Sequence, residues 1–368
     1  MNRRTFLSAG AIPLVPVVSG PVPIETRVAI ANVCAWPKLQ RLQDGTLLAF
    51  IFNQPCHGRW EGDLDCWESR DDGRKWRFRS RVAPHEPTTN RMNCAVGPAR
   101  NGDLMVICGG WSNKRPAGEV SPGPSRTLRP WVCRSSDQGR TWKINRDFPD
   151  PPSTPTGKDN QYYPFGAIET AADGSLCVAV YVARGSDREA YLLRSRDDGA
   201  TWNDRVPLNV PGGNETWILH LGEGQWLAAG RELNPKQPGH YLVLLSSGDD
   251  GRTWHRKMPL TLPTQINGNL VKLRDGRILL TYGNRNWGNF GVDARLSEDR
   301  GETWSPPFRI ASCPFQDCGY PSGVELPDGS MVTAHYTAVS EDFHYEMRVA
   351  RWNPRNFTRA GVPVSAGR

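Results

Sequence analysis

Ser-Gly-Asp-Asp-Gly-Arg-Thr-Trp, residues 247–254, decides the fold, because its pattern Ser-x-Asp-x-Gly-x-(Thr/Lys)-Trp occurs five times in the chain. The copies run over residues 69–76, 135–142, 195–202, 247–254 and 297–304. In each copy the Ser and Asp side chains can bond nearby backbone N–H groups, Gly can adopt a positive φ, and Trp supplies an apolar anchor. Five near-identical catalytic sites in one chain would make no mechanistic sense. We therefore interpret the motif as a structural fastener at a β-hairpin turn.

A second repeat, a turn followed by an apolar strand, alternates with the first. Its six turns are Asp44-Gly45, Asn101-Gly102, Asp173-Gly174, Glu223-Gly224, Asp275-Gly276 and Asp328-Gly329. Six such units, five of them followed by the Trp motif, predict an all-β fold, a six-bladed β-propeller of four-stranded antiparallel blades. The sixth unit, near residues 332–352, lacks the motif, so we expect the two chain ends to meet there. The repeats fill residues 21–368, which we predict to be a single domain.

The first 20 residues differ from the repeats. Asn2-Arg3-Arg4-Thr5-Phe6-Leu7 is a twin-arginine pattern followed by an apolar stretch, residues 9–18. We interpret residues 1–20 as a twin-arginine-type export signal and expect a periplasmic or secreted protein. Its removal lowers the formal net charge from +7 to +5, because it contains two arginines and no acid.

The mild positive charge suits an anionic ligand, but the chain has no dense Lys/Arg run and no nucleic-acid motif. We expect no nucleic-acid partner and, since no apolar run is long enough, no membrane span. The nine cysteines are scattered without metal-ligand spacing, so we expect no metal and no organic cofactor. In an oxidising compartment Cys313 and Cys318 could bridge a short loop. The sequence predicts no oligomeric state.

The repeated motifs resemble the Asp boxes, or BNR repeats, of the sialidase (neuraminidase) superfamily, and the resemblance spans residues 25–352. Asp boxes identify the fold better than the activity, because similar boxes occur in propellers that bind proteins or cleave other glycans. The resemblance implies a tyrosine nucleophile paired with a glutamate, a separate carboxylic acid/base, and three arginines that hold the substrate carboxylate. These residues would lie on loops that face the propeller axis.

Three positions match that pattern. Tyr320, in the segment Asp-Cys-Gly-Tyr-Pro-Ser at residues 317–322, corresponds to the family's nucleophile. Glu215 corresponds to the glutamate that hydrogen-bonds the tyrosine, and Arg231 to one arginine of the clamp. The pairing is chemically reasonable, because a phenol with a pKa near 10 is a poor nucleophile until a carboxylate takes its proton.

Other positions depart from the pattern. The family's opening Phe/Tyr-Arg-Ile-Pro segment is replaced by Asn-Val-Cys-Ala-Trp-Pro at residues 32–37, which contains no arginine and places Trp36 there. Arg285 and Arg91 are the nearby substitutes for the missing clamp residues. The acid/base is expected in the loop over residues 57–65, where Asp63 is the first candidate, Glu61 the second and His57 the third.

The sequence predicts a secreted glycoside hydrolase of exo-α-sialidase type, which removes a terminal acidic sugar from a glycan by a retaining mechanism. A propeller lyase or hydrolase acting on uronate-containing polysaccharides stays open, with tyrosine or histidine as the base. A non-catalytic glycan-binding propeller also stays open, with sugar-stacking tryptophans at positions 36, 60, 111 and 287. Structural roles are the competing interpretation: Tyr320 as a core residue, Glu215 and Arg231 as a salt bridge, and Asp63 bound to backbone N–H groups. The availability of Glu215 as a partner for Tyr320 favours the hydrolase.

Overall fold

The computed structural model describes residues 24–119, 126–152, 161–184, 187–233, 239–340 and 344–357. This part of the chain is all-β, with 24 strands and one short 3-10 helix at Pro354–Asn356. None of its helices is long and apolar enough to cross a membrane. The twin-arginine segment at residues 1–20 lies outside the described residues.

The strands, in chain order, are β1 (Glu25–Ala31), β2 (Cys34–Arg41), β3 (Leu47–Phe52), β4 (Leu64–Ser69), β5 (Arg77–Ala83), β6 (Cys94–Pro98), β7 (Leu104–Trp111), β8 (Thr127–Ser135), β9 (Lys143–Asn145), β10 (Tyr163–Thr170), β11 (Leu176–Arg184), β12 (Asp187–Ser195), β13 (Asp204–Pro207), β14 (Thr216–Gly222), β15 (Gln225–Leu233), β16 (His240–Ser247), β17 (His255–Pro259), β18 (Gln265–Lys272), β19 (Ile278–Asn284), β20 (Gly291–Ser297), β21 (Phe308–Ser312), β22 (Cys318–Glu325), β23 (Met331–Ala338) and β24 (Tyr345–Trp352).

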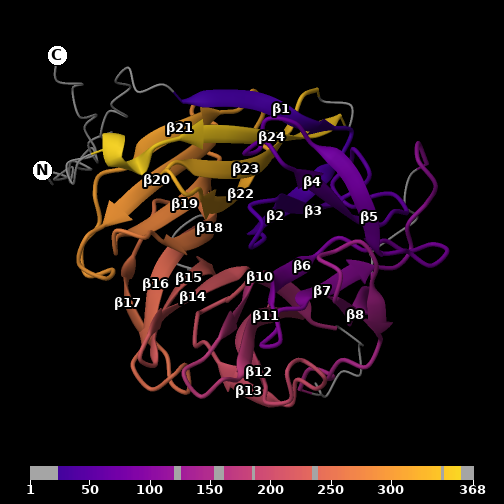
Figure 1. Cartoon of the computed structure of the whole chain (residues 1–368), viewed down its shortest axis with the longest axis horizontal. Helices are drawn as coiled ribbons and strands as arrows, with labels where there is room; N and C mark the ends of the chain where they lie inside the picture. Colours follow the sequence, from indigo (N-terminus) through magenta and orange to yellow (C-terminus); the bar gives the residue numbers. More distant parts are fainter. Residues whose placement is uncertain are drawn as a thin grey trace, which may run out of the picture.

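Consecutive strands pair antiparallel in groups of four. The groups β2–β5, β14–β17 and β18–β21 are separate four-stranded sheets, and a fourth sheet has the order β1-β24-β23-β22. The groups β6–β9 and β10–β13 form one eight-stranded sheet, because β6 and β10 pair in parallel over two residues each. Figure 1 shows the sheets around a common centre, with the first strands β2, β6, β10, β14, β18 and β22 nearest the middle. This all-β arrangement is compatible with a propeller.

The two ends of the described chain share one sheet. The N-terminal strand β1 pairs antiparallel with the C-terminal strand β24, from Glu25 opposite Arg351 to Ala31 opposite Glu346. In Figure 1 the two strands run side by side at the outer edge. This pairing confirms the expectation that the unit without an Asp box is the place where the chain ends meet.

Apolar clusters fill the spaces between neighbouring sheets. One cluster, for example, contains Phe50 of β3 and Val106 of β7, and another contains Tyr181 of β11 and Val243 of β16. A further cluster lies where the first strands converge, and it includes Trp36, Phe165, Trp217 and Tyr320. Burial of these faces supplies the main driving force for folding and holds the strand ends in a fixed arrangement.

Each Asp box forms the turn between the third and fourth strands of its unit. In the copy at residues 247–254, Ser247 Oγ donates to Asp249 Oδ1 (2.7 Å) and accepts the backbone N–H of Gly251 (2.9 Å). Asp249 Oδ1 also accepts the backbone N–H of Thr253 (2.9 Å). The same three bonds recur in the other four copies. The structural interpretation of these aspartates is therefore confirmed.

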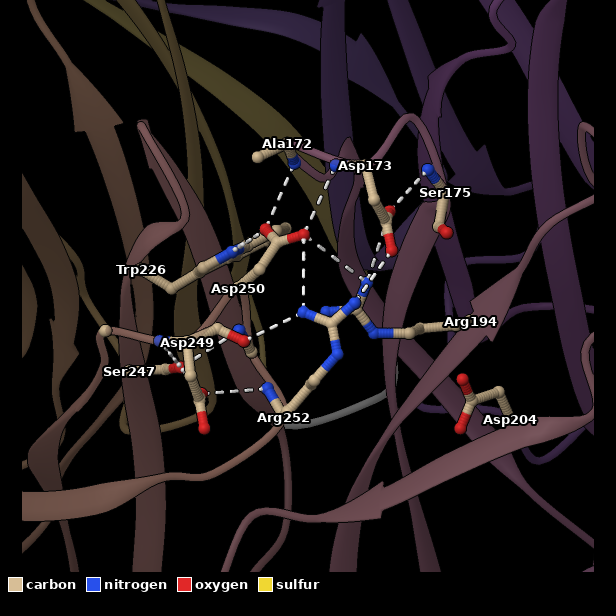
Figure 2. Close-up of polar contacts among 12 residues, drawn as sticks. Ala172, Asp173, Ser175, Arg194, Asp204, Trp226, Ser247, Asp249, Asp250 and Arg252 are labelled. Carbon is tan, nitrogen blue, oxygen red and sulfur yellow. Dashed lines mark hydrogen bonds and ion pairs between the residues drawn. The ribbon is translucent and has the colours of Figure 1, made fainter.

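The Asp box also fastens one sheet to the next (Figure 2). Asp250 accepts the backbone N–H of Ala172 (3.0 Å), in the turn between β10 and β11, and Arg252 donates to Asp173 (3.0 Å) in the same turn. Buried Arg194 of β12 lies 3.6 Å from Asp173 and 3.9 Å from Asp250. These polar contacts fix the relative placement of the two sheets.

We expect Trp254→Ala to lower the free energy of unfolding by about 3–5 kcal/mol, because it empties a buried site within the cluster between two sheets. Trp287→Ala is the matched control, since its side chain is 88% exposed, and it should change stability by less than about 0.5 kcal/mol. Urea unfolding followed by circular dichroism measures both. Equal free energies of unfolding for the two variants would contradict the role of the Asp-box tryptophan in holding the sheets together.

Candidate active site

Backbone bulges shape the centre of the molecule at the start of several first strands. Strands β2, β18 and β22 each shift register near their beginnings, and their bulges contain Trp36 (φ 109°), Asn267 (φ 64°) and Tyr320 (φ 50°). A positive φ at a residue other than glycine costs about 1–3 kcal/mol and is concentrated at functional sites. The Tyr320 side chain contacts both Trp36 and Glu215, and Asn267 also contacts Glu215. The bulges therefore build one site from strands that are distant in sequence.

Tyr320 and Glu215 form a hydrogen-bonded pair in this site. The Tyr320 hydroxyl donates to Glu215 Oε1 (2.6 Å), and both side chains are buried, with 4% exposure each. Glu215 Oε2 is paired with the Arg231 guanidinium and accepts the amide N–H of Asn267 (2.7 Å). Arg231 Nη1 is also 3.5 Å from the Tyr320 hydroxyl. The structure thus brings together three of the residues selected from the sequence.

The electrostatics of this pair favour an ionised carboxylate beside a neutral phenol. Burial alone would raise the pKa of Glu215, but the charge of Arg231 and the hydrogen bond from Tyr320 outweigh it and hold the pKa below its ordinary value. Burial, and then the charge of Glu215, raise the pKa of Tyr320 well above 10. At neutral pH the phenol keeps its proton and the carboxylate is ready to accept it.

A second polar cluster surrounds Asp317, directly beside the first. Asp317 Oδ1 accepts hydrogen bonds from Tyr336 (2.5 Å) and Arg285 (3.0 Å), and Oδ2 accepts one from Tyr345 (2.6 Å). His57 Nδ1 lies 2.9 Å from Asp317 Oδ2. Burial alone would raise the pKa of Asp317, but the hydrogen bond and charge of His57, followed by the charge of Arg285, hold it well below the ordinary value. Asp317 is therefore an anion throughout the neutral range.

These two carboxylates make the fold sensitive to acid. The folded-state pKa values of Glu215 and Asp317 lie below the values of an unfolded chain, about 4. Their charged forms therefore stabilise the fold above about pH 4, and this contribution is lost as the pH falls through the folded-state values. We expect the melting temperature to fall steeply below about pH 4 and to fall less steeply in Asp317→Asn. Parallel melting curves of the two proteins across pH would contradict this assignment.

Trp36 packs against aromatic rings of both clusters. Its ring lies 5.2 Å from the ring of Tyr320 and 5.3 Å from that of His57, and the side chain is 5% exposed. A tryptophan thus stands at the position where the family resemblance implied an arginine. Arg285 approaches Tyr320 from another direction, with its guanidinium carbon 5.7 Å from the ring centre.

A cavity of about 330 Å³ opens beside the Asp317 cluster and is lined by His240, Thr264, Arg285, Gln316 and Asp317, together with Gly239 and Ile266. Its volume is in the range of small-ligand pockets, about 300–1,000 Å³. Burial and the charges of Arg231 and Arg188 lower the pKa of His240 to about 4, so this imidazole is neutral at pH 7. The cavity therefore presents one arginine, one carboxylate and neutral polar groups to a ligand.

The structure does not bring Asp63 into this site. The Asp63 carboxylate accepts the backbone N–H of His85 (2.7 Å), contacts His85 Nδ1 (2.6 Å) and pairs with Arg81 (2.7 Å), and the residue is 4% exposed. Glu61 is held by the backbone N–H of Thr88. Neither carboxylate contacts Tyr320. Binding to a backbone N–H group, the structural role considered for Asp63, is thus what the structure shows.

Arg91 is likewise separate from the two clusters. It is 2% exposed, donates to the backbone oxygen of Arg129 (2.9 Å), and stacks on Trp131, with 3.6 Å between the guanidinium carbon and the ring centre. These contacts tie it to the sheet β6–β9. Its Nη2 atom also lies 3.8 Å from Glu86 Oε2.

Several site residues were missed by sequence reasoning. Asp317 lies within the segment that identified Tyr320, but its partners come from three distant segments, so its role depends on tertiary contacts. Asn267 occupies the same bulge position in β18 as Tyr320 in β22, and an alignment of the repeats could have found it.

Cys313 and Cys318 are free thiols in the structure. No three His, Cys, Asp or Glu side chains in the described ranges are grouped to hold a metal ion.

Comparisons with known proteins define the class. The chain matches the BNR repeat-like domain over residues 85–333, more than half of its length, and so belongs to the sialidase/BNR superfamily. A sialidase from Paraclostridium sordellii is 23% identical over 288 residues, which cover 70% of this chain and 69% of that protein.

Solved structures share the fold. A protein of unknown function from Dyadobacter fermentans has a TM-score of 0.74 at 20% identity, covering 90% of this chain and 99% of that one. The NanB sialidase from Streptococcus pneumoniae has a TM-score of 0.69 at 13% identity, covering 94% of this chain and 71% of that one. At these identities the likeness establishes the common architecture.

Proposed function

We propose that this protein is a glycoside hydrolase of exo-α-sialidase type, built as a single six-bladed β-propeller, that removes a terminal acidic sugar from a glycan. The observation that carries the proposal is the hydrogen bond of 2.6 Å between the buried Tyr320 hydroxyl and the ionised Glu215. The cyclic contacts among six first strands support the blade number. The sialidase names of the relatives agree with this activity.

The proposed reaction proceeds with retention of configuration in two displacements. Tyr320 Oη attacks the anomeric carbon and gives its proton to Glu215, while the glycosidic C–O bond breaks and its electron pair goes to the leaving oxygen, which is protonated. Water then attacks the same carbon, the tyrosyl–carbon bond breaks, and Glu215 returns the proton to the phenolate. A neutral tyrosine approaches an anionic sugar with less repulsion than a carboxylate would.

Arg231 and Arg285 are the proposed contacts of the sugar carboxylate. Each arginine is already paired with one acid, Arg231 with Glu215 and Arg285 with Asp317. Each nevertheless keeps N–H groups without a partner in the described structure, including the buried Nε of Arg231. A carboxylate could take charge-assisted hydrogen bonds from these groups. Trp36 would provide an apolar surface in place of a third arginine.

We also propose that the protein is exported through the twin-arginine segment at residues 1–20. Sequencing the N-terminus of protein isolated from the periplasm or medium tests this directly. Cleavage near Gly20 is the expected result, and Lys/Lys in place of Arg3 and Arg4 should leave the precursor in the cytoplasm.

A fluorogenic α-sialoside tests the activity, and proton NMR of the reaction mixture tests its stereochemistry. We expect release of the fluorophore and, as the first product, the α-anomer of the free sugar. The β-anomer as first product would overturn the retaining mechanism. No release from the sialoside would overturn the sialidase proposal, and a uronate-containing polysaccharide would then distinguish a hydrolase, whose products gain water, from a lyase, whose products are unsaturated.

A further inference from the structure

The proposed reaction needs a group that protonates the leaving oxygen, and the two carboxylates expected in that role are engaged elsewhere. Asp63 is buried among His85 and Arg81, and Glu61 is tied to the backbone N–H of Thr88. The Tyr320 and Glu215 pair cannot fill this role, since it already supplies the nucleophile and its base. A proton donor must therefore come from the remaining side chains of the site.

His57 and Asp317 form a second acid–base pair beside the first. His57 Nδ1 lies 2.9 Å from Asp317 Oδ2, and Asp317 is fixed in place by Tyr336, Tyr345 and Arg285. Asp317 accepts three hydrogen bonds from these other residues and is anionic, so the His57 nitrogen that faces it carries a hydrogen. The other nitrogen, Nε2, makes no hydrogen bond within the described part of the chain.

The histidine is also accessible and close to the nucleophile. Its side chain is 33% exposed, in contrast to 5% for Asp63. The rings of His57 and Tyr320 both pack against Trp36, at 5.3 and 5.2 Å, and both pack against Tyr336, at 6.4 and 5.7 Å. The imidazole and the phenol thus share two aromatic neighbours, Trp36 and Tyr336, which place both side chains in the same part of the site.

We propose, resting on the glycosidase function proposed above, that His57 is the general acid/base of the reaction and that Asp317 is its positioning residue. In the first displacement the imidazolium gives its Nε2 proton to the leaving oxygen as the glycosidic bond breaks. In the second, the neutral Nε2 takes a proton from water as the water oxygen bonds to the anomeric carbon. One water is consumed and the protein returns to its starting state. Asp317 keeps the Nδ1 hydrogen in place and stabilises the positive charge.

The test compares two substrates that differ in their need for a proton. The leaving group of sialyllactose is lactose, which would depart as a basic sugar alkoxide and therefore needs general acid catalysis. The leaving group of a 4-nitrophenyl sialoside is 4-nitrophenolate, a stabilised anion that hardly needs a proton. We expect His57→Gln to lower kcat on sialyllactose by about 10²–10⁴-fold. Cleavage of the nitrophenyl substrate should persist in this variant and appear as a burst of released 4-nitrophenolate. Azide should accelerate the second displacement, because it is a nucleophile that needs no base, and the product should be a sialyl azide of retained configuration.

Control variants separate the possible failures. Asp317→Asn should show the same dependence on the leaving group as His57→Gln, which a merely structural role would not produce, and thermal melting checks that both variants fold. Equal losses on the two substrates, or no loss, would overturn the role of His57. So would a loss selective for sialyllactose in Asp63→Asn that His57→Gln does not show. Wild-type protein inactive on both substrates would overturn the underlying sialidase proposal, and with it this inference.

Discussion

Replacing Tyr320 by phenylalanine is expected to lower kcat on an α-sialoside by about 10⁴-fold or more while leaving the fold intact, because it removes the atom that bonds to the sugar in the proposed mechanism. Phenylalanine keeps the ring that packs against Trp36, Phe165 and Tyr336. It removes only the hydroxyl that donates to Glu215. The loss should appear equally with activated and unactivated leaving groups, since the nucleophile is needed for both.

Tyr282→Phe is the matched control for this substitution. Tyr282 is 1% exposed in β19, and its hydroxyl has no hydrogen-bond partner within the residues that the structure describes. Steady-state kinetics on the two variants, with thermal melting to confirm folding, give the comparison. A Tyr320→Phe protein that keeps more than about a tenth of the wild-type kcat would remove tyrosine from the mechanism.

Replacing Glu215 by glutamine will lower both activity and stability. The expected activity loss, about 10³-fold in kcat, follows from removing the proposed base, the carboxylate to which the Tyr320 hydroxyl donates. The stability loss, about 3 kcal/mol, follows from leaving the Arg231 guanidinium, 16% exposed, without its counter-charge. Glutamine keeps the size of the side chain, but its single amide oxygen can take only one of the two carboxylate oxygen positions, so either the Tyr320 or the Asn267 hydrogen bond keeps its acceptor.

The double variant Glu215→Gln with Arg231→Met separates the two effects. Removing the unpaired guanidinium should restore a large part of the stability, measured by urea unfolding, without restoring activity. A double variant that regains activity would show that Glu215 only neutralises Arg231. Equal stability of the single variant and the wild type would contradict the proposed charge pairing.

The sequence predicted the architecture well because the repeats carry it. A motif whose Ser, Asp, Gly and Trp bond within eight residues folds locally, so five copies of it marked five turns correctly. The unit without a motif was placed correctly as the meeting point of the chain ends. The Tyr320, Glu215 and Arg231 group was found through the family resemblance, and the structure brings these residues together.

The loop residues were harder to predict, because tertiary contacts decide their surroundings. Asp63, Glu61 and His57 all lie within seven residues, and composition alone does not say which of them faces the site. Asp63 is captured by His85, which lies 22 residues away, whereas His57 is oriented by Asp317, which lies 260 residues away. The family pattern favoured a carboxylate here, and it gave no indication of a histidine–aspartate pair.

The most direct test of the central claim is to trap the covalent intermediate. Wild-type protein incubated with 2,3-difluorosialic acid, then digested and analysed by peptide mass spectrometry, should carry the fluorosugar on Tyr320, because the fluorine at carbon 3 slows the second displacement. Tyr320→Phe should carry none. An adduct on another side chain, or rapid sialoside hydrolysis without any adduct on Tyr320, would contradict the account.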